Sequence, residues 1–453
     1  MSSTSIGKYR WTICALLFFA TTVNYLDRQV LSLLAPDLSK EFGWSNTDYA
    51  NITAVFQFVY AIAMLFAGRL IDKIGTKAAY TLAIVIWSLG AVMHAFAIPA
   101  GEATVNVLSA LGLAVVPVSV AGFMLSRAVL ALGEAGNFPA AIKATAEYFP
   151  KHERSFATGI FNSGANIGAI LAPLTVPWIA AKWGWQTAFI AIGAVGFVWM
   201  LFWEMLYAKP EHQRRMSKEE LAYIQQHDTP AEPGAITSEK TSWLKLLTYR
   251  QTWAFVFGKF MTDGVWWFFL FWLPKYLEVQ YKMQKTDIVL PLTVLYSMTM
   301  VGSIGGGYLP AYFMKQGMAP YTGRMRAMLL IALFPLVVLL AQPFGYISAW
   351  VPVLLIGIGA SAHQAWSANI FTTVSDMFPK KAVASVVGIG GMAGGLGGVL
   401  VSKTGGWLFD YYKAAGSIQT GYAIMFSFCA VAYLVAWTVM KLLVPAHKDI
   451  TDL

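Results

Sequence analysis

The chain has 453 residues, of which 57% are hydrophobic and only 12% charged, and its formal net charge is +9. Because soluble domains usually carry about 25% charged residues, this composition excludes a soluble globular protein and predicts an all-α polytopic membrane protein. Cys14 and Cys429 lie far apart in apolar runs, so we expect no disulfide, metal site or cofactor. The basic residues are scattered over loops, so nucleic acid is not an expected partner.

Apolar runs predict twelve transmembrane helices, since about 20 apolar residues cross a bilayer. The first run resembles a signal peptide, but it has no small-x-small cleavage site and continues through Asn24, Asp27 and Arg28, which predicts a helix. The twelve expected ranges are 10–37, 49–70, 77–98, 118–148, 153–180, 186–207, 250–279, 288–314, 324–342, 348–377, 382–410 and 420–442.

The segment 99–117 is apolar but short and interrupted by proline. An additional crossing here would invert the side of every later loop, so we expect an interfacial or re-entrant piece.

The distribution of lysine and arginine predicts the orientation. Most of the 32 basic residues fall in loops on the side of the amino terminus, and the opposite side carries only Lys40, Lys182, Lys282, Lys285 and Lys413. By the positive-inside rule both termini are expected in the cytoplasm. The protein is expected in the inner membrane of a bacterium, as a monomer in contact with lipid.

The predicted domains are an amino-terminal six-helix bundle over 1–207, a linker over 208–248 and a carboxy-terminal six-helix bundle over 249–453. In the linker, Ser217 and Glu220 form a capping-box pattern that predicts a short surface helix. The bundles are related, because Phe149-Pro150-Lys151 recurs as Phe378-Pro379-Lys380 and the same offset relates Glu134 to His363. Such pseudo-symmetric repeats, with a site at their interface, are typical of secondary carriers.

Ionisable residues in the first and fourth predicted helices are the main candidates for function. Arg127 and Glu134 are seven residues apart, so they share one helix face, and Asp27 and Arg28 add two further charges. A charge at the bilayer centre costs at least ~2.5–3.5 kcal/mol, so this face is expected to line a polar cavity. A structural ion network between the two helices is the alternative.

Other polar side chains are candidates for hydroxyl recognition. Asn162 and Asn166 lie one turn apart, and Tyr and Trp combine an apolar face with a polar tip. Asn162 is equally compatible with a hydrogen bond to a neighbouring helix. His363 is compatible with two roles, a neutral hydrogen-bond partner of the substrate and a member of a proton relay. Lys259 and Asp263 predict an ion pair that neutralises its own charges, with a role in holding the inner gate as the alternative. The aromatic run 266–269 predicts lipid contact and packing, with a wall of the substrate site as the alternative. The remaining candidates are Tyr25, Tyr60, Gln364 and Trp366.

The loop GRLIDKIGTK, residues 68–77, resembles the signature loop of the major facilitator superfamily. In this loop Gly68 is expected to allow close helix approach, and Asp72, Lys73 and Gly75 complete the gating motif. Tyr25-Leu26-Asp27-Arg28 and Arg127 with Gly133-Glu134-Ala135 resemble motifs of the anion:cation symporters. Within that group, Gly307-Tyr308-Leu309-Pro310 and Ala362-His363-Gln364-Ala365 resemble motifs of bacterial hexuronate transporters.

The resemblance implies a proton-coupled symporter that imports a sugar-acid anion, with glucuronate or galacturonate preferred. It associates Arg28 with the substrate carboxylate and Asp27 and Glu134 with proton coupling, and Arg127 would partner either acid. Asp27 is a galactonate-transporter-like feature, so an aldonate or aromatic acid is an alternative substrate. A non-transporting sugar-acid sensor is a further alternative, and an enzyme is not expected because no nucleophile and base pattern appears.

Overall fold

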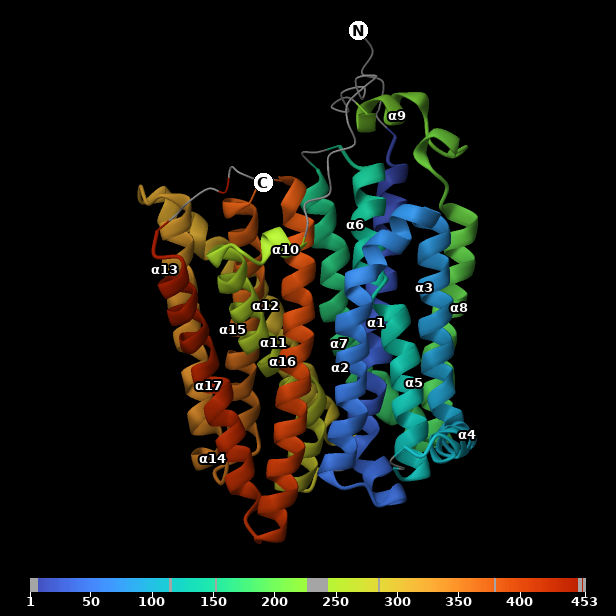
Figure 1. The fold of residues 1–453 in the computed structure, drawn as a ribbon, viewed down its shortest axis with the longest axis vertical. Coiled ribbons are helices and arrows are strands. Elements are labelled where there is room, and N and C mark those ends of the chain that lie inside the picture. The colour runs from blue at the N-terminus through green and yellow to red at the C-terminus, as the bar shows by residue number, and fades with distance from the viewer. Residues whose placement is uncertain are drawn as a thin grey trace. The chain divides into compact units, whose positions relative to one another are not determined.

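The computed structural model describes residues 7–113, 116–150, 153–225, 243–283, 286–378, 380–446 and 450. These residues form helices and no strand (Figure 1). They divide into two compact units. Unit 1 comprises Met1–Val30, Phe66–Ala172 and Lys182–Ser238, and unit 2 comprises Leu31–Leu65, Pro173–Ala181 and Glu239–Leu453.

Three long helices contribute to both units, namely α1 (Tyr9–Phe42), α2 (Asn46–Ile74) and α7 (Arg154–Trp183). The helices that lie wholly in unit 1 are α3 (Thr76–Met93), η1 (His94–Phe96), α4 (Ala97–Ala110), α5 (Val118–Glu134), α6 (Asn137–Tyr148), α8 (Trp185–Leu206), η2 (Pro210–His212) and α9 (Lys218–Gln225). Those wholly in unit 2 are α10 (Trp243–Leu246), α11 (Arg250–Tyr281), α12 (Val289–Lys315), α13 (Pro320–Leu333), η3 (Phe334–Leu340), α14 (Ala341–Phe344), α15 (Trp350–Met377), α16 (Lys380–Ala414) and α17 (Ile418–Leu443).

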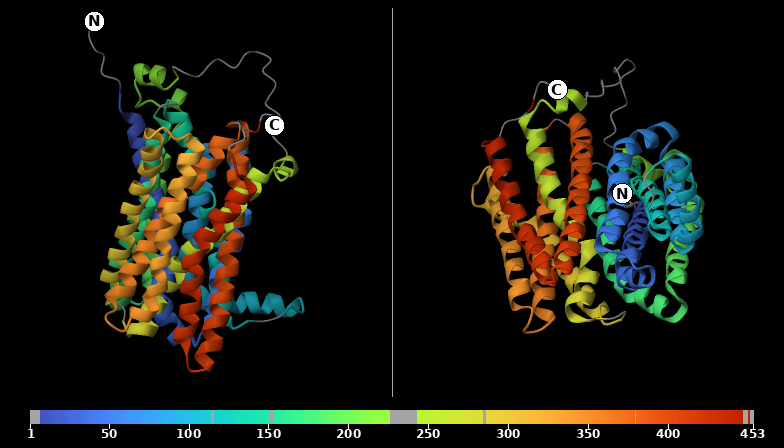
Figure 2. Two further views of the ribbon diagram at one scale, coloured as in Figure 1. Left: turned by 90° about the vertical axis from the view of Figure 1, so that its left-hand side faces the viewer. Right: turned by 60° about the horizontal axis from the view of Figure 1, so that its bottom comes forward.

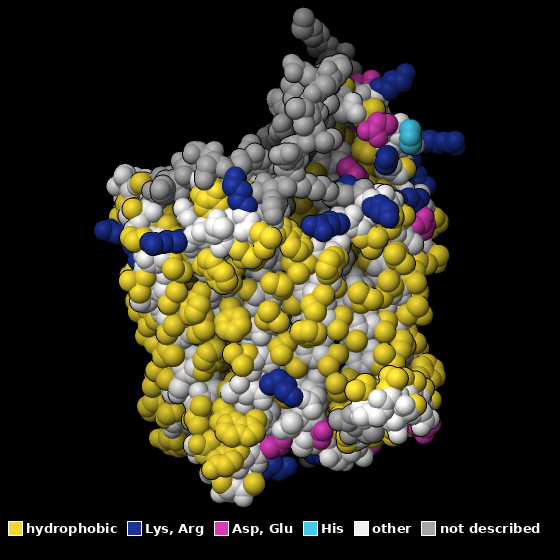
Figure 3. Space-filling model, viewed as in Figure 1, with side chains coloured by type: hydrophobic (Ala, Val, Ile, Leu, Met, Phe, Trp, Pro, Cys, Tyr) yellow, Lys and Arg dark blue, Asp and Glu magenta, His cyan; other side chains and the backbone are white. Residues whose placement is uncertain are grey.

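Ten helical segments of the described chain are long and apolar enough to cross a membrane. The helices α1 and α15, with 34 and 28 residues, are also long enough to cross a membrane, but they carry polar and ionisable residues near their middle. Together they account for the twelve predicted spans. Exposed aliphatic side chains such as Leu201 of α8 and Ile304 of α12 face outward, and apolar side chains cover the middle of the helices in Figure 3.

The predicted interfacial piece is a separate helix. After α3 the chain passes through η1 into α4, which lies across the direction of the long helices of unit 1 (Figure 2, left). Two glycines bring α4 against α5, since a Cβ at Gly101 would lie 1.9 Å from the carbonyl oxygen of Val118 and one at Gly122 would lie 1.7 Å from that of Ala97. This backbone contact fixes α4 on unit 1 without a further crossing.

The repeated Phe-Pro-Lys sequence marks equivalent helix ends. The carboxyl ends of α6 and α15 both have an extended capping residue, Phe149 and Phe378, with ψ values of 135° and 145°. Each of these residues precedes a proline, which disfavours the helical conformation for the residue before it. The same local cause therefore ends both helices.

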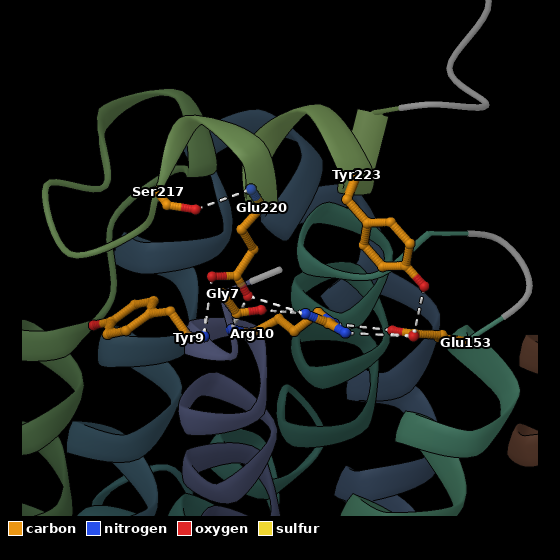
Figure 4. A network of polar contacts seen from close by, with 7 residues as sticks. All are labelled: Gly7, Tyr9, Arg10, Glu153, Ser217, Glu220 and Tyr223. Carbon is orange, nitrogen blue, oxygen red and sulfur yellow. Dashed lines mark hydrogen bonds and ion pairs between the residues drawn. The ribbon is translucent and has the colours of Figure 1, made fainter. Parts of the chain in front are cut away.

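The linker helix α9 is anchored on unit 1 by Glu220 (Figure 4). Its amino end is capped as predicted, because the Ser217 hydroxyl accepts a hydrogen bond from the Glu220 amide at 3.1 Å. The Glu220 carboxylate does not return to its own helix. It accepts hydrogen bonds from the backbone amides of Tyr9 and Arg10 at 3.1 and 3.0 Å, and so caps the amino end of α1.

Arg10 links this cap to the loop that precedes α7. Its Nε donates to Glu153 at 2.9 Å and its Nη1 to Glu220 at 3.2 Å (Figure 4). The Tyr223 hydroxyl of α9 donates to Glu153 at 2.8 Å, and that bond to the carboxylate raises the pKa of Tyr223. Three separate segments of unit 1 therefore meet at one arginine.

Replacing Glu220 with Ala should release α9 from unit 1. Hydrogen bonds to a charged group contribute about 1.5–3 kcal/mol each, so we expect amide hydrogen exchange in α9 to accelerate at least about tenfold, measured by mass spectrometry. Glu219→Ala is the matched control, because Glu219 is exposed. Equal exchange rates in the two variants would show that Glu220 does not anchor α9.

Candidate functional site

The centre of the candidate site is an ion pair between α1 and α5 in unit 1. The Nη2 and Nε atoms of Arg28 both donate to Oε2 of Glu134, at 2.7 and 2.8 Å. The two residues are 3% and 1% exposed. Removing one partner of such a pair leaves an uncompensated buried charge, so each charge depends on the other.

Arg28 is held on two further sides. Its Nη2 donates to the Asn24 side chain at 3.4 Å, and its guanidinium carbon lies 4.7 Å from the centre of the Tyr25 ring. The Nη1 of Arg127 donates to the backbone carbonyl of Arg28 at 3.3 Å. Arg127 and Glu134 are both buried, as expected for residues on one helix face.

Asp27 precedes Arg28 in α1 and is buried, but its carboxylate forms no hydrogen bond with the pair among the described residues. Among the described residues neither of its carboxylate oxygens has a hydrogen-bond partner, and the Oε1 atom of Glu134 has none either. A buried ionised carboxylate without hydrogen bonds is strongly unfavourable. Among the buried carboxylates described in unit 1, Asp27 and Glu134 are therefore the ones with oxygens that lack a donor.

The predicted fourth helix is interrupted directly after Glu134. The turn at 135–136 separates α5 from α6, although the sequence predicted one helix over 118–148. Pro139 lies four residues after Ala135 and has no N–H to donate to the Ala135 carbonyl. The break therefore follows from the proline and places Glu134 at a helix end.

The α7 candidates have accessible side chains. Asn162 is exposed and Asn166 is half-buried. Both belong to the part of α7 that lies in unit 1. Their accessibility fits contact with water or a polar ligand.

Three predicted residues lie in α15 of unit 2. His363 is enclosed by aromatic rings. Its imidazole stacks on Trp266 with 5.0 Å between the ring centres, and its Nδ1 lies 2.9 Å from the Tyr433 hydroxyl. Trp366 also contacts Tyr433 edge-on at 5.6 Å, and Gln364 is half-buried. Tyr433 was not predicted, and its distance of 70 residues from His363 leaves no local signal for the contact.

The ion pair predicted within α11 is present. Lys259 Nζ lies 2.7 Å from Asp263 Oδ2 and 4.4 Å from the centre of the Phe371 ring. The aromatic run 266–269 of the same helix is buried, so its predicted contact with lipid is wrong. Tyr60 of α2 packs against Trp267 of this run at 6.2 Å.

The predicted gating motif forms the end of α2 and the turn into α3. Gly75 adopts a φ of 85°, which favours glycine, and Lys73 is exposed. The expected close approach at Gly68 is wrong for this structure, because no described atom lies within 4 Å of the position of its Cβ. The side chain of Asp72 lies outside the described residues.

The profile of the Major Facilitator Superfamily matches residues 17–402. The chain belongs to this superfamily. The crystal structure of a D-xylose-proton symporter has the same fold, with a TM-score of 0.73 at 15% identity over 98% of this chain and 100% of that one. The prediction that this chain has the fold of the superfamily is therefore confirmed.

Relatives within the superfamily confirm the predicted resemblance. The chain is 30% identical to the hexuronate transporter of Escherichia coli (strain K12), over 96% of this chain and 95% of that protein. It is 31% identical to the galacturonate transporter of Dickeya chrysanthemi, over 68% of this chain and 84% of that protein. This superfamily member is a multi-pass membrane transporter and not an enzyme.

The ion pair predicts unequal effects of two substitutions on stability. Glu134→Ala leaves Arg28 buried without its carboxylate, so we expect the free energy of unfolding to fall by about 3–5 kcal/mol. Asp27→Asn removes a carboxylate without a described hydrogen bond and should not destabilise. Thermal unfolding in detergent measures both, and equal losses would contradict the assignment.

Proposed function

We propose that the protein is a proton-coupled symporter that imports a sugar-acid anion, preferably a hexuronate such as glucuronate or galacturonate. The observation that carries this proposal is the Arg28–Glu134 pair, in which a buried guanidinium is held by a carboxylate that one proton can neutralise. The activities named for the two relatives support the substrate class.

The coupling follows from competition for Arg28. While Glu134 is ionised, its Oε2 atom occupies two donors of the guanidinium. Protonating Glu134 weakens this contact and frees the planar fork for bidentate binding of the substrate carboxylate. Substrate and proton therefore favour the same state of the carrier.

The balance of charge among four buried residues of unit 1 supports the same coupling. Arg28 and Arg127 balance Asp27 and Glu134 when all four are ionised, so a bound monocarboxylate would add an uncompensated negative charge. A proton on Asp27 or Glu134 restores neutrality and lowers the cost of enclosing the substrate in a site of low dielectric. We assign Asp27, Glu134 and Arg127 to this proton-coupling group.

Recognition of the sugar is assigned to polar and aromatic groups. Tyr25, Asn162 and Asn166 belong to unit 1, and Tyr60 and the α15 group belong to unit 2. The α15 group comprises His363, Gln364 and Trp366. Tyr and Trp provide apolar faces for the ring, while amides and the imidazole bond hydroxyls.

The orientation and state are part of the proposal. Lysine and arginine side chains gather mostly near one end of the helices in Figure 3, and the positive-inside rule assigns that end to the cytoplasm. Both termini would then be cytoplasmic, in the inner membrane of a bacterium, with the chain acting as a monomer. The gating motif of Gly68, Asp72, Lys73 and Gly75 would control access from that side.

Asp27 favours a second candidate substrate. The resemblance associates an acid at this position with galactonate transport, and in this structure Asp27 is buried next to Arg28. An aldonate symporter is therefore the second candidate. Competition of labelled glucuronate with galactonate and benzoate in proteoliposomes separates a hexuronate carrier from an aldonate or aromatic-acid carrier.

Replacing Glu134 with Gln should separate exchange from accumulation. Glutamine keeps an acceptor for Arg28 but cannot carry the coupled proton, so counterflow of glucuronate should persist while uptake driven by a proton gradient is lost. Proteoliposomes measure both activities with the same protein. Glu204→Gln, at the exposed end of α8, is the control and should retain both, and gradient-driven uptake by Glu134→Gln would remove Glu134 from the coupling role.

A further inference from the structure

Gln57 of α2 is a buried amide whose role the preceding assignments leave open. Its side chain has no exposed surface, and neither Nε2 nor Oε1 has a hydrogen-bond partner among the described residues. Leaving such a group unsatisfied costs about 1–3 kcal/mol. Buried amides are normally bonded, so a group outside the described chain is expected to satisfy this one.

The preceding turns of α2 show how structural polar groups are satisfied in unit 2. Asn46 donates to Asp410 of α16 at 2.9 Å, and the Tyr49 hydroxyl donates to the backbone carbonyl of Phe271 at 2.5 Å. The Thr53 hydroxyl donates to the Tyr49 carbonyl of its own helix at 3.2 Å. Gln57, one turn further along, has no such partner among the described residues.

The environment of Gln57 combines a glycine-lined helix with aromatic rings. A Cβ at Gly398 of α16 would lie 3.0 Å from Gln57 Nε2 and 2.6 Å from Trp267 Cδ1. A Cβ at Gly395, one turn away, would lie 3.2 Å from the backbone oxygen of Gln57. Tyr60, three residues after Gln57 on the same helix, packs against Trp267 at 6.2 Å. An amide beside an indole and a phenol is a combination suited to a sugar, because the rings cover C–H groups while the amide bonds a hydroxyl.

We propose that the side-chain amide of Gln57 hydrogen-bonds a hydroxyl group of the transported sugar acid, next to Trp267. This inference rests on the proposed function and deepens it by assigning a specificity-determining contact to α2. In the present structure α2 and α16 are packed together at Gly395 and Gly398, so the amide becomes available to substrate when these two helices separate. An amide both donates and accepts, as a sugar hydroxyl does, so one hydroxyl can satisfy both of its atoms.

The test compares Gln57→Met with the parent protein by counterflow of labelled D-glucuronate in proteoliposomes, with monodeoxy-D-glucuronates as competitors. Parent protein should bind one deoxy analogue about tenfold more weakly than glucuronate, because one hydrogen bond is lost. Gln57→Met should bind glucuronate about tenfold more weakly than the parent does, and should no longer distinguish that analogue from glucuronate. Loss of discrimination at a single hydroxyl is a coupling that a purely structural role does not produce.

A second pair of variants guards against a folding defect in Gln57→Met. Gly398→Ala introduces a methyl group near the amide and should weaken glucuronate binding, whereas Gly388→Ala on the same helix meets no described atom within 4 Å and should not. If Gln57→Met retains the full discrimination of the parent among all deoxy analogues, the inference is wrong and the amide serves packing or a bound water. If the parent protein itself shows no glucuronate or galacturonate counterflow, the proposed substrate class fails first, and the inference fails with it.

Discussion

The burial of Arg28 against Glu134 constrains much of unit 1. A guanidinium and a carboxylate that are both withdrawn from water are stable only while they remain together. The pair therefore holds α1 and α5 at a fixed register, and Asn24, Tyr25 and the Arg127 contact to the Arg28 carbonyl complete its surroundings. Because a buried ion pair is not by itself a strong source of stability, the proposed function assigns these charges to coupling and substrate binding.

The two units contribute different chemistry. Unit 1 contains the buried arginines and carboxylates, whereas unit 2 contains a neutral group of rings around His363, with Trp266 stacked on the imidazole and Tyr433 at its Nδ1. Glu134 and His363 occupy corresponding positions in the repeated sequence, and both are buried. Under the proposed function, the first repeat would handle the anion and the protons, and both repeats would contribute to hydroxyl recognition.

The sequence predicts features that depend on local or periodic properties. Apolar runs predict the spans, ten of which are long and apolar enough in the described chain to cross a membrane. Helical periodicity predicts that Arg127 and Glu134 are buried on one face, and the prolines after Phe149 and Phe378 account for two helix ends. Each of these rests on residues that are close in the chain.

Contacts between distant residues are not predictable in this way. Arg28 and Glu134 are 106 residues apart, so the sequence indicates several charges near the same depth but not which arginine meets which acid. Glu220 illustrates the same limit, because its position suggests a cap for its own helix while its carboxylate caps α1, about 210 residues away. The burial of the aromatic run 266–269 depends on the neighbouring helices that cover it, which hydropathy does not report.

The interruption at 135–136 has a mechanical consequence for the acid that precedes it. A continuous helix resists bending because every turn is bridged by backbone hydrogen bonds, and proline removes one of those bridges. The segment beginning at Asn137 can therefore pivot about this point at lower cost than in an unbroken rod. Under the proposed function Glu134, the last residue before the pivot, gains and loses a proton, and this change of charge would act where it can alter the angle between α5 and α6.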